Sequence, residues 1–167
     1  MLKFSDRAEV IALLKLKPVL VDVYPDTFDI NVEAIDVVLL THGHLDHIGY
    51  LPRLIKQGFK GKIIGTAPTL AIAEIILKDS AKIHEEDAER ANKEKYTKHK
   101  PALPFYTLLE AEKTIANFQV EMPNKWISFT KNISFRFQYN GHIIGATFIE
   151  LDIYGKRFVF LGDIGRT

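Results

Sequence analysis

Three of the six histidines in this chain lie within residues 42–47, which read His-Gly-His-Leu-Asp-His. Imidazole nitrogen and carboxylate oxygen are the ligands that bind zinc where no thiolate is available, and the chain contains no cysteine. The short intervals allow His42 and His44 to face one point, and Asp46 and His47 to face a second point nearby. This spacing favours a centre for two metal ions over a centre for one.

The alternative is a run of surface or core histidines that bind no metal. Against it, the loop follows residues 35–41, an apolar segment typical of a buried strand. Side chains placed directly after such a strand project from the edge of a sheet, where loops build sites on a rigid scaffold. Four ligand-type residues in this pattern and position indicate a metal site.

Two further ligand-type residues also follow predicted strands. His142 lies in a glycine-flanked turn, and Asp163 follows the apolar residues 158–161. Each is weak evidence alone. A single histidine need not be a ligand, and an aspartate after a glycine is common in turns. Together with the histidine loop they complete the predicted set of metal ligands, which is His42, His44, Asp46, His47, His142 and Asp163. The remaining histidines, His84 and His99, are interpreted as surface or helix-packing residues.

The elements that must position these residues alternate between strand and helix early in the chain and are strands alone later, which predicts a mixed α/β fold. The predicted helices cover residues 48–58, 68–95 and 107–118. The predicted strands cover residues 19–23, 35–41, 62–66, 126–129, 133–139, 147–153 and 157–161. In the long helix, Ile72, Ile75, Ile76 and Ile83 are expected to form the buried stripe. Gly43 is expected to let the histidine loop turn and to keep bulk away from the ions.

The composition sets limits on partners and location. At 167 residues the chain has the size of one domain or part of a larger one, with no apolar run near the ~20 residues of a membrane span. The first nine residues carry charges where a signal peptide needs an apolar core, which with the absence of cysteine favours the cytoplasm. The net charge of +1 gives no global argument for nucleic acid, so RNA would have to bind a local surface.

Five segments resemble the metallo-β-lactamase superfamily, and within it the β-CASP branch of RNA-processing nucleases. Residues 41–52 resemble the second motif of that branch, which is the hallmark histidine loop, together with the helix that follows it. Residues 80–87 and 98–104 resemble its helical segment and loop. Residues 141–146 and 160–166 resemble its third and fourth motifs. The resemblance covers about residues 32–167, with the motifs in the family order.

The resemblance implies a role for each ligand. His42, His44 and His142 would hold one metal, Asp46 and His47 the other, and Asp163 would bridge both. Two zinc ions are expected, with manganese as the alternative for a histidine and carboxylate set. The implied reaction is hydrolysis of an RNA phosphodiester by a water activated between the ions, which Asp46 would orient or deprotonate.

Two features depart from the family pattern. The opening strand hairpin is not recognisable in residues 1–31, where residues 19–23 are its expected remnant. The chain ends at Thr167, after the fourth motif, without the β-CASP cap or the C-terminal half that carries a final histidine ligand. We therefore expect residues 1–167 to form a single, truncated metallo-β-lactamase-like domain, a partial αββα sandwich with impaired activity. Its second metal should bind more weakly than the first or be absent, and its uncovered apolar sheet face predicts self-association or a partner chain.

Three functions are compatible with the sequence. The first is a metal-dependent phosphodiester hydrolase, the N-terminal part of a β-CASP ribonuclease. The second is a small-molecule hydrolase of the same superfamily, such as a thioesterase or lactonase, which the segments 44–52 and 98–104 disfavour. The third is a non-catalytic module that binds a metal or a partner.

Overall fold

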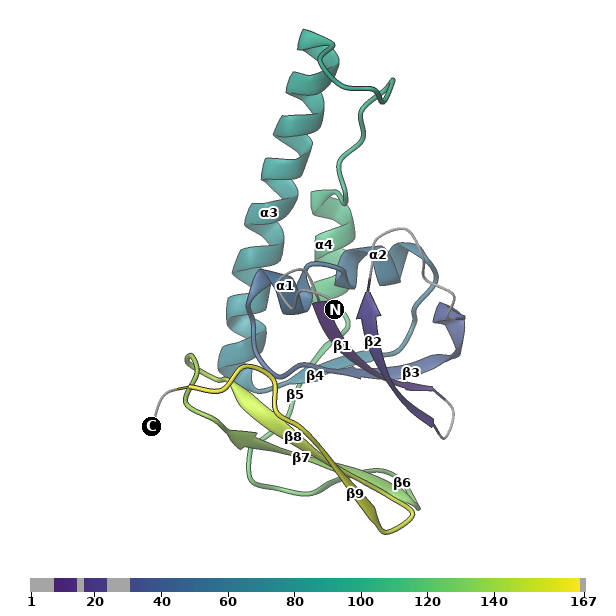
Figure 1. Cartoon of the computed structure of the whole chain (residues 1–167), viewed down its shortest axis with the longest axis vertical. Helices are drawn as coiled ribbons and strands as arrows, with labels where there is room; N and C mark the ends of the chain where they lie inside the picture. The colour runs from purple at the N-terminus through teal and green to yellow at the C-terminus, as the bar shows by residue number, and fades with distance from the viewer. Residues whose placement is uncertain (1–7, 15–16, 24–30, 166–167) are drawn as a thin grey trace, which may run out of the picture.

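Helices, a five-stranded sheet and a four-stranded sheet form three stacked layers (Figure 1). The computed structural model describes residues 8–14, 17–23 and 31–165. One apolar cluster lies between the helices and the first sheet, and a second lies between the two sheets. This helix–sheet–sheet order is a mixed α/β arrangement and agrees with the predicted partial sandwich.

The first sheet has the strand order β2-β1-β3-β4-β5. Its strands are β1 (Ala8–Leu14), β2 (Lys17–Val23), β3 (Ile35–Leu39), β4 (Lys62–Gly65) and β5 (Phe118–Val120). β1 pairs antiparallel with β2 and β3, whereas β3, β4 and β5 run parallel. A short 3-10 turn, Val32–Ala34, leads into β3. Because parallel strands end at the same edge of a sheet, the chain that leaves β3 starts at the edge where β4 also ends.

The opening hairpin, of which only the strand at residues 19–23 was predicted, is present as β1 and β2. β1 and β2 pair residue for residue from Ala8 with Val23 to Leu14 with Lys17. β1 was not predicted because Ala8–Leu14 lacks a clear period of two and is rich in alanine and leucine, which favour helices. Pairing on both sides, with β2 and with β3, outweighs this local preference.

The helices are α1 (Leu45–Ile48), α2 (Leu51–Lys56), α3 (Ala67–Glu94) and α4 (Leu108–Ile115). The single helix predicted over residues 48–58 is thus two short ones, and α1 starts inside the histidine loop. α4 begins with a capping box between Thr107 and Glu110, as its sequence favours. It stops before the predicted residue 118, because Phe118 belongs to β5.

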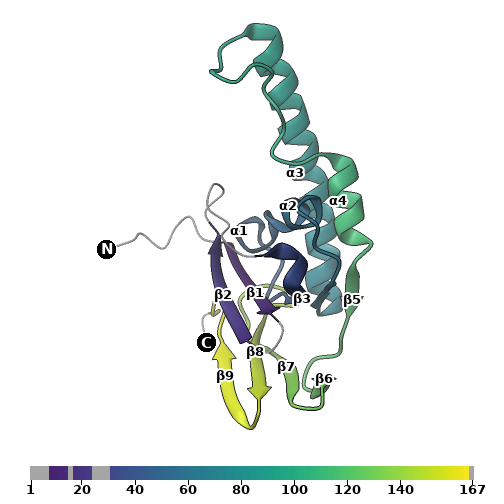
Figure 2. The same ribbon diagram turned by 90° about the vertical axis from the view of Figure 1, so that its right-hand side faces the viewer.

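The buried face of α3 differs from the predicted isoleucine stripe. Ile75 and Ile83 are exposed, and the buried positions repeat every three or four residues along another face: Leu70, Ala73, Leu77, Ala81, Ala88 and Ala91. The small alanines allow the helix to approach its neighbours closely, so packing rather than side-chain size selects this face. The C-terminal half of α3 extends well beyond the sheets (Figure 2).

The second sheet has the strand order β6-β7-β8-β9 and is antiparallel throughout. Its strands are β6 (Ile127–Thr130), β7 (Ile133–Tyr139), β8 (Thr147–Ile153) and β9 (Lys156–Phe160), close to the predicted bounds. In β7 the aromatic residues Phe135 and Phe137 are fully buried and alternate with half-buried polar residues. This alternation turns one face of the sheet towards Val37 and Leu39 of β3.

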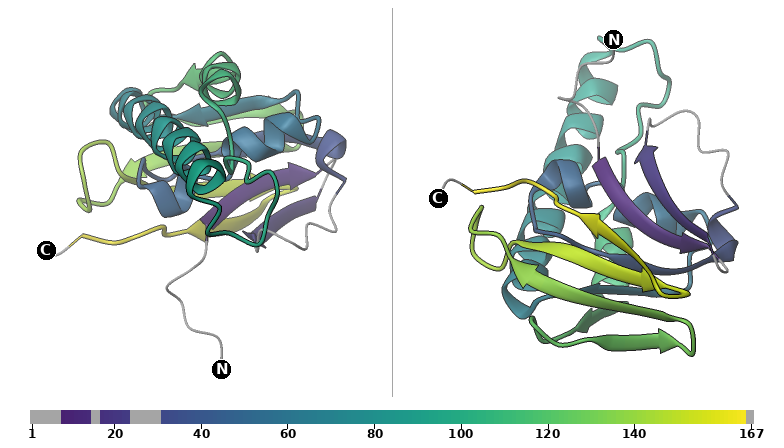
Figure 3. Two further views of the ribbon diagram at one scale, coloured as in Figure 1. Left: turned by 90° about the horizontal axis from the view of Figure 1, so that it is seen from above. Right: turned by 60° about the horizontal axis from the view of Figure 1, so that its bottom comes forward.

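The other face of this sheet is not covered by any of the described elements (Figure 3). Exposed apolar side chains occur along the sheet at Trp126, Phe129 and Val159. The expected self-association through such a face stays a prediction. Among the described residues, no helix combines the length and the apolar character that crossing a membrane requires.

Candidate metal centre

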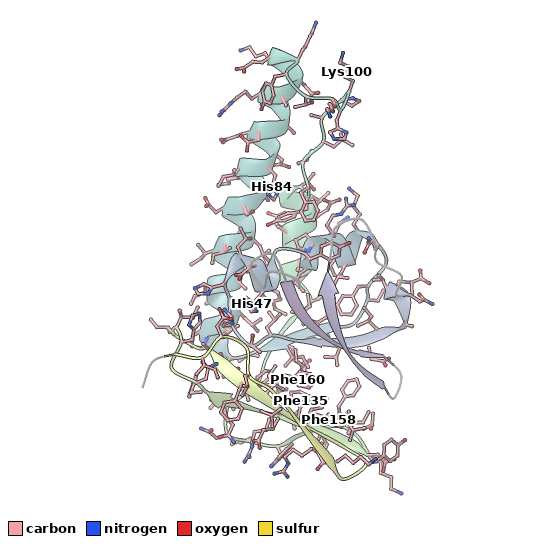
Figure 4. All side chains as sticks on the ribbon, in the orientation of Figure 1. His47, His84, Lys100, Phe135, Phe158 and Phe160 are labelled. Atoms are coloured by element: carbon pink, nitrogen blue, oxygen red, sulfur yellow. The ribbon has the colours of Figure 1, made fainter. Side chains whose placement is uncertain are left out.

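Three strand ends bring the predicted ligands together. β7 and β9 are both antiparallel to β8, so they point the same way and the loops after them leave the same end of the second sheet. The loop after β3 meets them there, because the Thr147 amide and hydroxyl both donate hydrogen bonds to the Thr41 carbonyl, at 2.9 and 3.1 Å. His42, His142 and Asp163 therefore reach one small region from three loops. Figure 4 labels His47 in this region.

Four of the predicted ligands form one compact group. The His44 Nδ1 atom lies 3.1 Å from His42 Nε2 and 3.2 Å from His142 Nε2. The Asp163 Oδ2 atom lies 3.4 Å from His142 Nε2 and 3.7 Å from His42 Nε2. All four ligand atoms lie within 4.8 Å of one another. Four atoms that each bind zinc at about 2.05 Å in a tetrahedron are about 3.3 Å apart, so the spacing fits a metal ion.

The other two predicted ligands lie beside this group but outside it. His47 Nε2 is 3.5 Å from Asp46 Oδ2 and 3.5 Å from Asp163 Oδ1. The two carboxylate oxygens of Asp163 thus face different partners, Oδ2 towards His42 and His142 and Oδ1 towards His47. This division is the arrangement that a carboxylate shared by two ions requires.

Exposure of the side chains increases across the centre. His42 is fully buried and His47 is 6% exposed, whereas Asp163 is 45% and Asp46 is 58% exposed. The imidazoles of His42 and His47 therefore form the floor, and the two carboxylates form the side that solvent and a substrate can reach.

The electrostatics of the floor keep His42 uncharged. Burial, together with the neighbouring His47, His44 and His142, lowers the pKa of His42 from 6.5 to about 4, against the opposing effect of Asp163. Its Nδ1 lies 3.2 Å from the Thr41 hydroxyl, which leaves Nε2 facing the other ligands. A neutral imidazole with Nε2 directed inward is the form that binds a metal.

The lowered pKa of His42 predicts that the metal-free protein loses stability in acid. Below pH 6.5 the unfolded chain binds a proton at His42 that the folded chain does not, so the free energy of unfolding decreases as the pH falls from 6.5 towards 4. The full loss from this residue is about 3 kcal/mol. Urea unfolding at pH 7 and pH 5 should show a smaller pH dependence for His42→Gln than for the wild type. His99→Gln, at an exposed position, is the control. An unchanged pH dependence in His42→Gln would contradict the assignment.

Some residues that hold the loops in place were not predicted from the sequence. The hydroxyls of Thr66 and Thr69, at the start of α3, both donate to the Gly145 carbonyl at 2.8 Å. Gly43 has a different role from the one expected. A Cβ atom there would lie 2.9 Å from Ile72 Cγ2 and 3.0 Å from the Thr69 carbonyl oxygen, so glycine is needed for contact with α3 rather than for room around the ions. The only sequence signal for these contacts is the position of the residues beside the motifs.

A hollow of about 520 Å³ lies away from this centre, between the C-terminal half of α3 and residues 96–105. Its lining includes His84, Asp87 and His99, but among the described residues neither histidine belongs to a group of three or more ligand-type residues that could hold a metal. The ring of His84 instead packs against Phe105 and Tyr106, as a helix-packing histidine should. The histidine and aspartate cluster is therefore the better candidate for chemistry.

Three histidines and a carboxylate, at the loop edge of two packed sheets, form a group that could hold a metal ion. The chain belongs to the metallo-beta-lactamase superfamily, whose sequence profile matches residues 11–167. It is 29% identical over 138 residues to Ribonuclease TTHA0252 of Thermus thermophilus, which covers 83% of this chain and 28% of that protein. It is 31% identical to Endoribonuclease YSH1 of Candida glabrata, over 84% of this chain and 17% of that protein. It is also 31% identical to an RNase J-like protein of Methanocaldococcus jannaschii, over 84% of this chain and 28% of that protein.

These comparisons confirm the resemblance to the superfamily and to its β-CASP ribonucleases. The chain spans between 17% and 28% of the length of the three relatives. The match includes every predicted ligand, and the ligand group of the structure suits a divalent metal ion.

Proposed function

We propose that this chain carries the metal centre of a ribonuclease, which hydrolyses phosphodiester bonds of RNA. The observation that carries the proposal is that ligand atoms of His42, His44, His142 and Asp163 all lie within 4.8 Å of one another. The ribonuclease names of the relatives support RNA as the substrate class.

Zinc is the ion that suits this set best, because three of the four grouped ligands are imidazoles. His42, His44 and His142 would hold the first ion, Asp46 and His47 the second, and Asp163 would contact both. When bound, the ions supply a Lewis acid and lower the pKa of water, which yields a nucleophile near neutral pH.

The side chains of the centre have separate tasks in this proposal. Neutral His42 offers a lone pair without first losing a proton, because its pKa lies near 4. Asp46 lies on the exposed side, so its carboxylate can orient the attacking water and accept its proton. The phosphodiester approaches from this side, since His42 and His47 close the opposite one.

The test is cleavage of labelled single-stranded RNA by the purified chain after loading with zinc. We expect fragments that disappear on treatment with a chelator and return when zinc is added back. A panel of thioesters and lactones serves as the comparison. Hydrolysis of a thioester or lactone with RNA left intact would replace the proposal with a small-molecule hydrolase. Zinc binding with no hydrolysis of any substrate would replace it with a non-catalytic metal-binding module.

A further inference from the structure

Asn140 connects the loop that carries His142 with the loop that carries Asp163. It follows β7 directly and is half-buried. Its side-chain Nδ2 donates to the carbonyl of Leu161 at 3.1 Å and to the carbonyl of Asp163 at 2.7 Å. Its Oδ1 accepts from the His142 amide at 3.2 Å. Both donor hydrogens and the acceptor of the amide group are therefore used.

Few hydrogen bonds fix the loop that carries Asp163, although Gly162 packs closely on the Thr41 side chain. Residues 161–165 form no helix or strand. Within the part of the chain that the structure describes, the two bonds from Asn140 are the only hydrogen bonds to the backbone of these residues. Close packing of Gly165 on the Gly141 carbonyl adds a contact between the same two loops. Asp163 nevertheless has to place two carboxylate oxygens against three imidazoles, which requires a fixed backbone.

We propose that Asn140 is a positioning residue for the metal centre, which sets Asp163 relative to His142 by binding both backbones with one side chain. This inference rests on the proposed metal-binding function. Asn140 touches no ligand atom itself. It acts by fixing the distance between Asp163 Oδ2 and His142 Nε2, which is 3.4 Å. Residues that orient ligands in this way change metal affinity by about 10–100-fold when they are replaced.

The experiment compares zinc affinity of the wild type and Asn140→Ala by competition with a chelator. We expect a loss of about 10–100-fold in Asn140→Ala. Asn132→Ala is the matched control, since Asn132 is exposed and precedes β7 at the strand's opposite end. It should bind zinc like the wild type. The visible absorption spectrum of bound cobalt, which reports the coordination geometry, should change in Asn140→Ala and not in Asn132→Ala.

A second variant, Asn140→Asp, keeps the shape of the side chain and the acceptor for the His142 amide but loses both donors. Because its new charge itself attracts cations, the cobalt spectrum is its readout, and we expect a changed spectrum. Wild-type affinity in Asn140→Ala and a wild-type spectrum in both variants would overturn the role of Asn140, even if the variants melted at a lower temperature. Failure of the wild type to bind zinc or cobalt would instead overturn the proposed metal centre.

Discussion

Replacing Asp163 with asparagine is expected to lower the zinc affinity of the chain by more than about 100-fold and to reduce the number of bound ions. The reason is the division of its carboxylate. Oδ2 lies 3.4 Å from His142 Nε2, and Oδ1 lies 3.5 Å from His47 Nε2. Asparagine keeps the size of the side chain but offers one neutral oxygen in place of two charged ones. The measurement is calorimetric titration of the metal-free chain with zinc, which gives affinity and stoichiometry together.

Asp152→Asn is the matched control for this substitution. Asp152 is half-buried in β8 and accepts a hydrogen bond from the Gly155 amide in the β8–β9 turn. The substitution Asp152→Asn therefore removes the same charge at a structural position. We expect its zinc affinity and stoichiometry to match the wild type. If Asp163→Asn also matched the wild type, Asp163 would not be a ligand, and the centre would have to be rebuilt from the histidines alone.

The candidate site could be predicted from the sequence because each ligand lies in a short motif directly after a strand. Apart from the short β5, which was not predicted, the strands after residue 31 are apolar or alternating enough to be recognised from the sequence, so the places where the chain turns are also recognisable. Residues 42–47 needed only the end of β3, and His142 and Asp163 needed the ends of β7 and β9. Their convergence then follows from the direction of the strands.

The parts that failed depend on contacts between distant segments. β1 becomes a strand through pairing with β2 and β3. This pairing could not be predicted from its alanines and leucines, which favour a helix. The buried face of α3 is set by close approach at Ala73 and Ala81, while the larger Ile75 remains exposed.

Asn140 shows the same limit at the site itself. An asparagine followed by glycine is typical of a turn. Its bonds to residues 161 and 163 exist only once the two loops have met. A local pattern therefore predicts the candidate ligands and not the residues that position them.

Replacing Gly145 with alanine is expected to destabilise the protein by about 2–5 kcal/mol and to weaken zinc binding through displacement of His142. Gly145 has a φ of +82°, which costs an L residue about 1–2 kcal/mol. A Cβ atom there would also lie 2.7 Å from the Thr69 amide nitrogen and 2.8 Å from Pro68 Cβ, in the first turn of α3. Relief of these contacts moves the loop away from α3 and breaks the bonds that Thr66 and Thr69 donate to the Gly145 carbonyl.

Gly155→Ala separates backbone strain from this contact. Gly155 has a φ of +77°, close to that of Gly145, and a Cβ atom there would meet nothing within 4 Å. It should therefore lose only about 1–2 kcal/mol of stability and keep wild-type zinc affinity. Urea unfolding and zinc titration of both variants give the comparison. Equal losses of stability in the two variants, or unchanged zinc affinity in Gly145→Ala, would show that the contact with α3 does not position His142. A larger loss in Gly145→Ala, accompanied by weaker zinc binding, would show that the start of α3 positions His142, although it contributes no ligand.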